Sequence, residues 1–179
     1  MHQGAGRKMQ TAQSINETVK VIQRGLAGHL TYVAATAGWG TTSELALYPP
    51  IAAILMGQKW ECRCQWVMSR KIGNAGAFPT IDFVARRWGS KDWMIAIEVK
   101  LLPTRRKSHE VKVEGDVAKL VKFKKSNKLA NIYLLIAGRK KEIDEAYVLI
   151  DGERIYLRDR APVIADLGRT AWGSVAIRL

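Results

Sequence analysis

The chain has 179 residues, of which 47% are hydrophobic and 25% are charged, and this balance is typical of one globular domain with its own core. It carries 29 Lys and Arg against 16 Asp and Glu, and a net charge of +13 favours nucleic acid as a partner. No apolar run is long enough to cross a membrane, and residues 1–8 lack the apolar stretch of a secretory signal. We therefore expect a cytoplasmic or nucleoid-associated protein that does not contact membranes.

Residues 1–40 are expected to form an N-terminal helical extension. Ser14 and Glu17 form a capping box, and the apolar residues that follow at helical spacing predict a helix over 14–25. Residues 31–35 favour a short strand. A second helix is predicted over 41–57, where Pro49-Pro50 must kink or restart it because proline cannot donate a hydrogen bond inside a helix.

A strand is predicted over 60–68, and it contains both cysteines. Cys62 and Cys64 are two residues apart, so they point to one face of that strand. This spacing does not suit a disulfide, and the chain has no second cysteine pair to complete a zinc site. We expect reduced, partly buried thiols.

Residues 81–87 and 93–102 are predicted to form a β-hairpin around a polar, Gly-containing turn. If the turn centres on Ser90, Asp82 faces Glu98 across the two strands. Side chains alternate along a strand, so Glu98 and Lys100 share one face. Two adjacent carboxylates repel each other unless a cation lies between them or one takes up a proton. The hairpin therefore indicates a divalent metal site, and the alternative is an exposed Glu/Lys strand face opposite an Asp.

The second half of the chain begins with a polar, basic loop over 103–113. Gly115-Asp116 opens an amphipathic helix, with Val117, Leu120 and Val121 predicted to face inward and Lys119, Lys122 and Lys125 outward. Residues 132–137 form an apolar run that suits a buried strand. Asp151-Gly152 predicts a hairpin of 147–150 with 154–157, and a last strand is expected over 175–178.

An Asp followed on the next strand by Glu-x-Lys resembles the core motif of the PD-(D/E)XK nuclease superfamily. The predicted order of elements over 41–138 is similar to the αβββαβ core of the restriction-endonuclease-like fold, an α/β fold with a mixed central sheet flanked by helices. Glu44, Leu55-Met56-Gly57 and Asp116-Val117-Ala118-Lys119-Leu120 resemble the pattern of resolvase-like members. Pro79 departs from the strict motif, since it precedes Asp82 by three positions and not by one. Residues 139–179 would then form a C-terminal hairpin and tail of a single domain spanning 1–179.

The resemblance implies a magnesium site, at which manganese would substitute. Asp82 and Glu98 would bind Mg²⁺ together with the backbone carbonyl of Val99, and Lys100 would orient or activate the attacking water. Glu44 would reach the metal through a water or hold a second ion. The alternative for Glu44 is an ordinary acid in a first helical turn, where the helix dipole favours it.

Nucleic-acid contacts are expected in the segment after the hairpin, because residues 100–128 contain ten basic and three acidic residues. The residues predicted to bind backbone phosphates are Arg105, Arg106, Lys107, Lys119, Lys122 and Lys125, and the alternative is a solvated basic surface. A solvated role is the better interpretation for His109. Trp39 and Trp88 can stack on bases, although tryptophans more often occupy core or hinge positions.

The sequence thus predicts a Mg²⁺-dependent endonuclease that hydrolyses DNA with structural selectivity or weak sequence preference. A homodimer would be needed to cut both strands. One alternative is a non-catalytic nucleic-acid-binding module of the same fold. Another is a structural subunit whose basic face docks an acidic partner.

The basic loop generates a prediction about salt dependence. Replacing Arg105, Arg106 and Lys107 together by alanine should flatten the dependence of DNA affinity on salt by roughly two to three units of slope, since each phosphate contact releases counterions. Turnover at saturating DNA should change far less. A titration of DNA binding against salt measures this, and an unchanged slope would mean that the loop is solvated surface.

Overall fold

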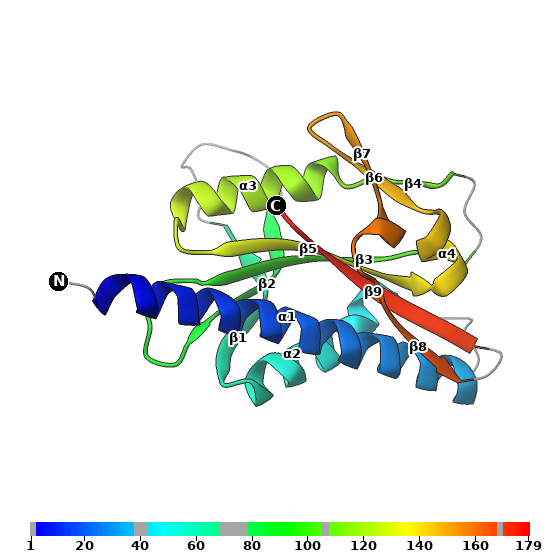
Figure 1. The fold of residues 1–179 in the computed structure, drawn as a ribbon, viewed down its shortest axis with the longest axis horizontal. Helices are drawn as coiled ribbons and strands as arrows, with labels where there is room; N and C mark the ends of the chain where they lie inside the picture. The colour runs from blue at the N-terminus through cyan, green and yellow to red at the C-terminus, as the bar shows by residue number, and fades with distance from the viewer. Residues whose placement is uncertain (1–2, 38–42, 69–78, 105–107, 168–169) are drawn as a thin grey trace.

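The computed structural model describes residues 3–37, 43–68, 79–104, 108–167 and 170–179, with the backbone alone for 3–13 and Thr170. Its helices and strands follow one another along the chain in the order shown in Figure 1. They are α1 (Gln3–Thr36), η1 (Glu44–Leu47), α2 (Tyr48–Gly57), β1 (Trp60–Val67), β2 (Thr80–Arg87), β3 (Ile95–Leu101), β4 (Glu110–Val111), α3 (Glu114–Ser126), β5 (Asn131–Arg139), α4 (Lys140–Glu145), β6 (Tyr147–Ile150), β7 (Glu153–Tyr156), η2 (Leu157–Asp159), β8 (Val163–Leu167) and β9 (Thr170–Arg178).

A six-stranded mixed sheet forms the centre of the molecule, with strand order β1-β2-β3-β5-β9-β8. β3 and β5 are parallel, and every other neighbouring pair in this sheet is antiparallel. A second, three-stranded sheet has the order β4-β6-β7. The prediction of an α/β protein with a mixed central sheet and flanking helices is therefore confirmed.

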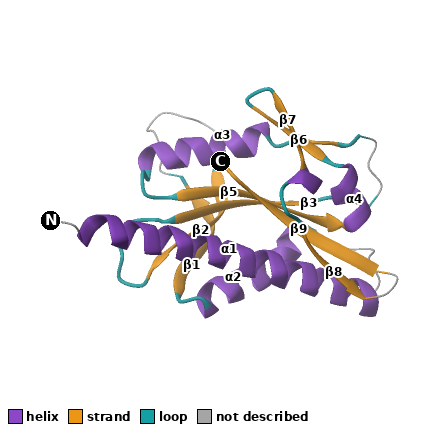
Figure 2. Ribbon diagram, in the orientation of Figure 1, coloured by secondary structure: helices purple, strands orange, loops and turns teal. Residues whose placement is uncertain are grey.

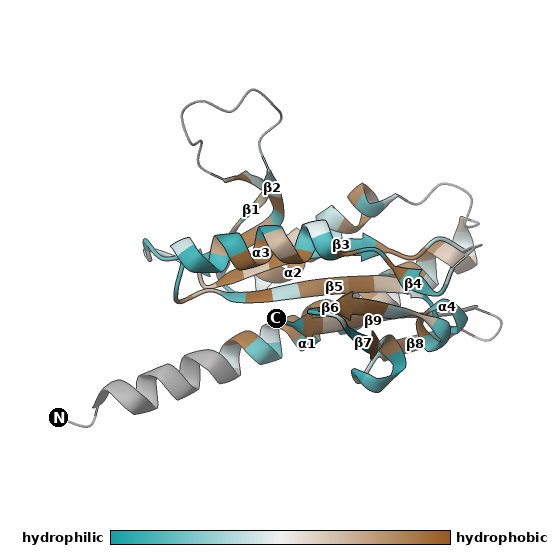
Figure 3. Ribbon diagram, turned by 90° about the horizontal axis from the view of Figure 1, so that it is seen from above, coloured by the Kyte–Doolittle hydropathy of each residue, from teal (hydrophilic) through white to brown (hydrophobic). Residues whose placement is uncertain are grey.

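Helices cover both faces of the central sheet (Figure 2). α1 and α2 lie against one face, where Ile22, Leu26 and Ile51 pack with Phe83 and Tyr133. α3 lies on the other face, where its side chains Leu120 and Phe123 pack with Val84, Ala96 and Ile132. Side chains alternate along a strand, so β2 and β3 contribute to both cores. Figure 3 shows the apolar character of the central strands between these helices.

The parallel pair β3–β5 requires a long crossover, and the crossover contains α3. β5 is buried along most of its length, as predicted for residues 132–137. Gly138 is the last buried residue of β5, and a Cβ atom at this position would lie only 2.8 Å from the Cβ of Leu102. The close approach of β5 to the end of β3 therefore depends on glycine.

The hairpin of β2 and β3 has the predicted register. Phe83 pairs with Ile97, Val84 with Ala96 and Ala85 with Ile95, which are the pairs expected for a turn centred on Ser90. Gly89 in the turn has φ of 75°, a conformation that glycine adopts at low cost. The paired ladder stops at Phe83–Ile97, so Asp82 and Glu98 lie just beyond its end.

Pro49 and Pro50 lie in the first turn of α2, directly after Tyr48, which agrees with the predicted restart of the helix at Pro49-Pro50. The short helix η1 ends at Leu47, and the prolines occupy the first positions of α2, where the missing N–H costs no helical hydrogen bond. α2 ends at Gly57, which was the expected end. Both cysteines are free thiols, with Cys62 partly buried and Cys64 exposed.

The predicted strand over 31–35 is wrong, because α1 runs through it to Thr36. Leu26 and Leu30 are fully buried, and the Thr31 hydroxyl donates to the carbonyl of Ala165 in β8. Contacts of α1 with β8 and β9 therefore override the β-branched residues of this stretch. The predicted helix over 14–25 is the middle of this longer helix.

Other differences lie in and after the crossover. Val121 was predicted to face inward but is 40% exposed, and Phe123 takes the buried position. The loop over 103–113 contains the short strand β4, and the sequence did not predict α4 or β8. The hairpin of β6 and β7 is confirmed, whereas the expected tail supplies two strands of the central sheet. No described helix is long and apolar enough to cross a membrane.

Candidate active site

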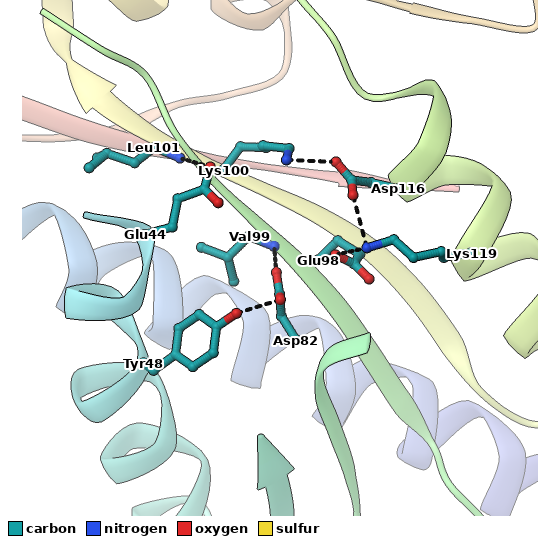
Figure 4. Close-up of polar contacts among 9 residues, drawn as sticks. All are labelled: Glu44, Tyr48, Asp82, Glu98, Val99, Lys100, Leu101, Asp116 and Lys119. Atoms are coloured by element: carbon teal, nitrogen blue, oxygen red, sulfur yellow. Dashed lines mark hydrogen bonds and ion pairs between the residues drawn. The ribbon is translucent and has the colours of Figure 1, made fainter. Parts of the chain in front are cut away.

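Charged side chains from four elements gather beside the open end of the β2–β3 ladder (Figure 4). We call them the charged cluster, which consists of Glu44, Asp82, Glu98, Lys100, Asp116 and Lys119. η1 supplies the first, β2 the second, β3 the next two and α3 the last two. The hairpin thus brings the predicted Asp82, Glu98 and Lys100 into one region of the molecule.

Asp82 is held by two hydrogen bonds. Its Oδ2 accepts from the backbone N–H of Val99 at 2.8 Å, and its Oδ1 accepts from the hydroxyl of Tyr48. The ring of Tyr48 packs edge-on against Phe83 with centroids 4.9 Å apart, so the hydroxyl is itself positioned. Opposite Asp82, Gln65 has φ of 48° and is skipped in the β1–β2 register. This irregularity coincides with the point where Asp82 leaves the regular sheet.

Glu98 is the most buried carboxylate of the charged cluster, with only 2% of its surface exposed. Its Oε2 accepts a hydrogen bond from Lys119 Nζ at 2.9 Å. Its Oε1 is buried and has no hydrogen-bond partner in the described part of the structure. Burial, together with the charge of Asp82, raises the pKa of Glu98 to about 8. An unpartnered buried oxygen of this kind is costly unless a proton or a cation satisfies it.

Lys100 and Lys119 are joined through Asp116. Lys100 Nζ lies 2.9 Å from Asp116 Oδ2, and Lys119 Nζ lies 3.0 Å from Asp116 Oδ1. Burial is the largest single effect and lowers the pKa of Lys100, but the hydrogen bond to Asp116 and the negative charges of Asp116 and Glu44 together outweigh it, so the net pKa is raised. Both lysines are therefore ammonium groups at neutral pH, and α3 is linked to β3 by a chain of ion pairs.

Glu44 contacts the end of β3. Its Oε1 accepts a hydrogen bond from the backbone N–H of Leu101 at 3.2 Å, which ties η1 to the strand. Its charge also contributes to the raised pKa of Lys100. This contact gives Glu44 a structural role and leaves its predicted role toward a metal untested.

The backbone of Val99 faces Asp82. Its N–H points at the carboxylate, and in a strand the carbonyl of the same residue points to the same side as its N–H. The Val99 carbonyl therefore points toward the edge of β3 on which Asp82 lies, as its predicted role requires.

The predicted nucleic-acid contacts divide into three groups. Lys122 and Lys125 are exposed on α3 as expected, whereas Lys119 does not face outward, because its ammonium lies between Glu98 and Asp116. Arg105, Arg106 and Lys107 lie outside the described residues. The structure therefore leaves the phosphate contacts of this loop as a prediction.

Three other candidate residues are less informative. His109 is exposed, and its Nδ1 lies 3.6 Å from Glu145 Oε2, away from the charged cluster. Trp88 is 69% exposed in the hairpin turn, and Trp39 lies outside the described residues. Trp88 in the hairpin turn and His109 beside Glu145 are thus described at positions other than the charged cluster.

Sequence analysis did not identify Tyr48 and Asp116 as site residues. Asp116 carried a signal, since it opens the Asp-x-x-Lys-Leu pattern at the start of α3. Tyr48 carried none, because only the packing of α2 against β2 brings its hydroxyl to Asp82.

The donor set fits a hard divalent cation. No group of three or more His, Cys, Asp or Glu side chains forms a metal site among the described residues. Mg²⁺, however, keeps several of its waters and is commonly bound by one or two carboxylates. Asp82 and Glu98 provide two, with a carbonyl beside them and an unused oxygen on Glu98. The charged cluster holds four carboxylates and two ammonium groups, a net charge of −2 when all are ionised, which a divalent cation would balance.

The raised pKa of Glu98 predicts how stability depends on pH without metal. The folded protein keeps a proton on Glu98 up to about pH 8, whereas the unfolded chain loses it near pH 4.5. Stability should therefore fall as pH rises through this window, by on the order of 1 kcal/mol or more. Denaturant unfolding in EDTA at several pH values measures this, and Glu98→Gln should flatten the dependence. Equal pH dependence in both proteins would contradict the assignment.

The chain matches no protein-family model, no curated protein and no solved structure. Its chemistry is therefore inferred from its own residues.

Proposed function

We propose that this protein is a Mg²⁺-dependent endonuclease of the PD-(D/E)XK type that hydrolyses phosphodiester bonds in DNA. The observation that carries the proposal is the buried, unpartnered Oε1 of Glu98 near Asp82, with Lys100 on the same strand. The order α2, β1, β2, β3, α3, β5 supports it, because it agrees with the αβββαβ core of the restriction-endonuclease-like fold. The antiparallel β2–β3 hairpin and the parallel β3–β5 pair also support that fold, to which β4 is an addition.

Hydrolysis of a phosphodiester needs a positioned water and stabilisation of the charge that develops on phosphorus and on the leaving oxygen. Mg²⁺ held by Asp82, Glu98 and the Val99 carbonyl would supply Lewis acidity at the phosphate, and Mn²⁺ would substitute for it. Val99 N–H and Tyr48 orient Asp82 so that its position does not depend on the substrate. Asp116 orients Lys100 and Lys119 at once.

The charge state of Lys100 favours one of its two possible roles. A general base must give up its proton near neutral pH, which requires a lowered pKa. The pKa of Lys100 is raised instead. Lys100 therefore acts as an ammonium group that holds the attacking water or stabilises the negative charge of the transition state.

The DNA would lie along the exposed basic face of α3, where Lys122 and Lys125 reach solvent. Contacts of lysine with phosphate give affinity without sequence preference, which suits structure-selective or weakly specific cleavage. A homodimer would place two charged clusters on the two strands of a duplex. The cytoplasm, where the chain has access to DNA, is the proposed location.

A second function is favoured by the partners that the two carboxylates already have. Val99, Tyr48 and Lys119 satisfy three of the four carboxylate oxygens of Asp82 and Glu98. These contacts within the protein are enough for a non-catalytic nucleic-acid-binding module of the same fold, in which the carboxylates need not bind a metal. DNA binding without metal-dependent cleavage would establish that function.

Conservative changes to the two carboxylates test the proposal. Asp82→Asn and Glu98→Gln should each lower cleavage by more than about 100-fold, because loss of a metal ligand should exceed the 10- to 100-fold cost of losing a ligand's partner. DNA affinity should stay the same or rise, since negative charge is removed. Linear, supercoiled, branched and single-stranded DNA would be incubated with Mg²⁺, Mn²⁺ or EDTA. Asp166→Asn, an exposed change on β8, is the control, and cleavage at the wild-type rate by either ligand variant would refute the assignment.

Lys100→Ala separates metal binding from chemistry. Turnover should fall by about 10²- to 10³-fold, the usual effect of removing one group that stabilises transition-state charge. Mg²⁺ uptake measured by calorimetry should not weaken, because the ammonium is not a ligand. Lys112→Ala, an exposed change, should behave as wild type. Normal uptake together with unimpaired cleavage would remove Lys100 from the mechanism.

A further inference from the structure

A second feature of α3 lies beyond the charged cluster. The surface is hollowed between the end of β1, the segment that leads into β3 and the second half of α3. We call this the tryptophan hollow, and it is lined by the apolar residues Trp66, Trp93 and Phe123 and by the polar residues Lys122, Ser126 and Asn127. Aromatic surface beside an ammonium, a hydroxyl and an amide is the chemistry that recognises a nucleotide.

The two tryptophans are held in place by cations. Their ring centroids are 5.0 Å apart at an interplanar angle of 59°. The guanidinium of Arg63 lies 5.3 Å from the Trp66 ring, and that of Arg86 lies 4.7 Å from the Trp93 ring. Glu61 fixes Arg86 through two hydrogen bonds of 2.9 and 2.6 Å. Fixed aromatic rings next to positive charge suit a ligand that is flat and anionic.

The size of the tryptophan hollow limits what can enter it. Its volume is about 170 Å³. An apolar cavity of about 150 Å³ in another protein binds benzene, so one six-membered ring fits here. A second hollow of about 250 Å³ shares Trp93, Ser126 and Asn127 and continues toward Lys128, and Asp92 also lines it. A heterocyclic base can therefore occupy the first hollow while its sugar extends along the second.

α3 connects the tryptophan hollow with the charged cluster. Lys119 contacts Glu98, and Lys122 is one turn further along the same helix, about 4.5 Å by the helical rise. Residues three apart lie on neighbouring positions of one side of a helix. α3 runs along the face of the sheet over β3 and β5 (Figure 1), so a strand with a phosphate at the cluster can place a neighbouring phosphate at Lys122.

We propose that the tryptophan hollow binds one unpaired nucleobase of a DNA strand whose scissile phosphate lies at the charged cluster. The base stacks on Trp66, its edge meets Ser126 and Asn127, and Lys122 holds the adjacent phosphate. A base inside a duplex is paired and stacked, so it cannot enter. The substrate class is thus single-stranded or branched DNA, an inference that rests on the proposed nuclease function.

Binding measurements without metal test this independently of cleavage. Fluorescence anisotropy in EDTA would compare a labelled oligothymidine strand with a duplex of the same length. Trp66→Ala should weaken binding of the single strand by about 5- to 150-fold, the range for loss of one base stack, and leave the duplex unchanged. Lys122→Gln should lower the salt slope on the single strand by about 0.7. The controls are Tyr32→Ala and Lys141→Gln, exposed changes away from the tryptophan hollow.

A change in the DNA tests the same contact without altering the fold. Because Trp66 packs on Trp93, its removal can loosen this region, and a thermal melt would reveal that. Wild-type protein should then bind an oligothymidine with one abasic position more weakly. The abasic change and Trp66→Ala should not be additive, since both remove one interaction.

The outcomes separate the two proposals. If wild-type protein binds and cleaves DNA but Trp66→Ala and the abasic position change nothing, the tryptophan hollow binds no base and the nuclease proposal stands. Equal affinity of wild-type protein for single strand and duplex would also overturn the base-binding role. If wild-type protein neither binds nor cleaves any DNA, the nuclease proposal fails, and the base-binding role fails with it.

Discussion

The antiparallel register between β2 and β3 is the constraint on which the rest of the candidate site depends. It puts Asp82 and Glu98 just past the last paired residues, Phe83 and Ile97, where the strands no longer bind each other. A slip of one residue would turn Glu98 and Lys100 to the opposite face of the sheet, toward the core that now contains Ile97 and Val99. Burial of Ile97 and Val99 in that core therefore fixes the position of the carboxylates.

Charge balance explains why α3 lies where it does. Glu98 is buried in a protein whose net charge is +13, yet its immediate surroundings are acidic. Lys119 donates a hydrogen bond to one carboxylate oxygen of Glu98, and Asp116 forms ion pairs with both Lys119 and Lys100. Breaking this chain at Asp116 would leave two partly buried ammonium groups without their shared partner, which is costly in a protein interior. α3 thus packs on one face of the sheet and also contributes two side chains to the charged cluster.

The sequence predicted most of the features that depend on residues close together in the chain. The hairpin register followed from the turn residues and the period of two, and the restart of α2 followed from Pro49-Pro50. The sequence-based prediction failed where packing between distant segments determines the structure. Residues 31–35 have β-branched side chains that favour a strand, but contacts of α1 with β8 and β9 stabilise them as helix. The roles of Tyr48 and the inward turn of Lys119 depend on how helices pack on the sheet. No spacing along the chain carries that information.

The position of β9 has a consequence for folding. β5 forms the middle of the sheet, but its second edge is covered only by β9, which also packs against α1. β9 must pair with β5 to close the centre of the sheet, and its contacts with α1 join segments so distant in sequence that they form slowly. Until then β5 presents an unpaired, apolar edge. A chain still being synthesised thus carries all the charged residues of the cluster before β9 is available to pair with β5.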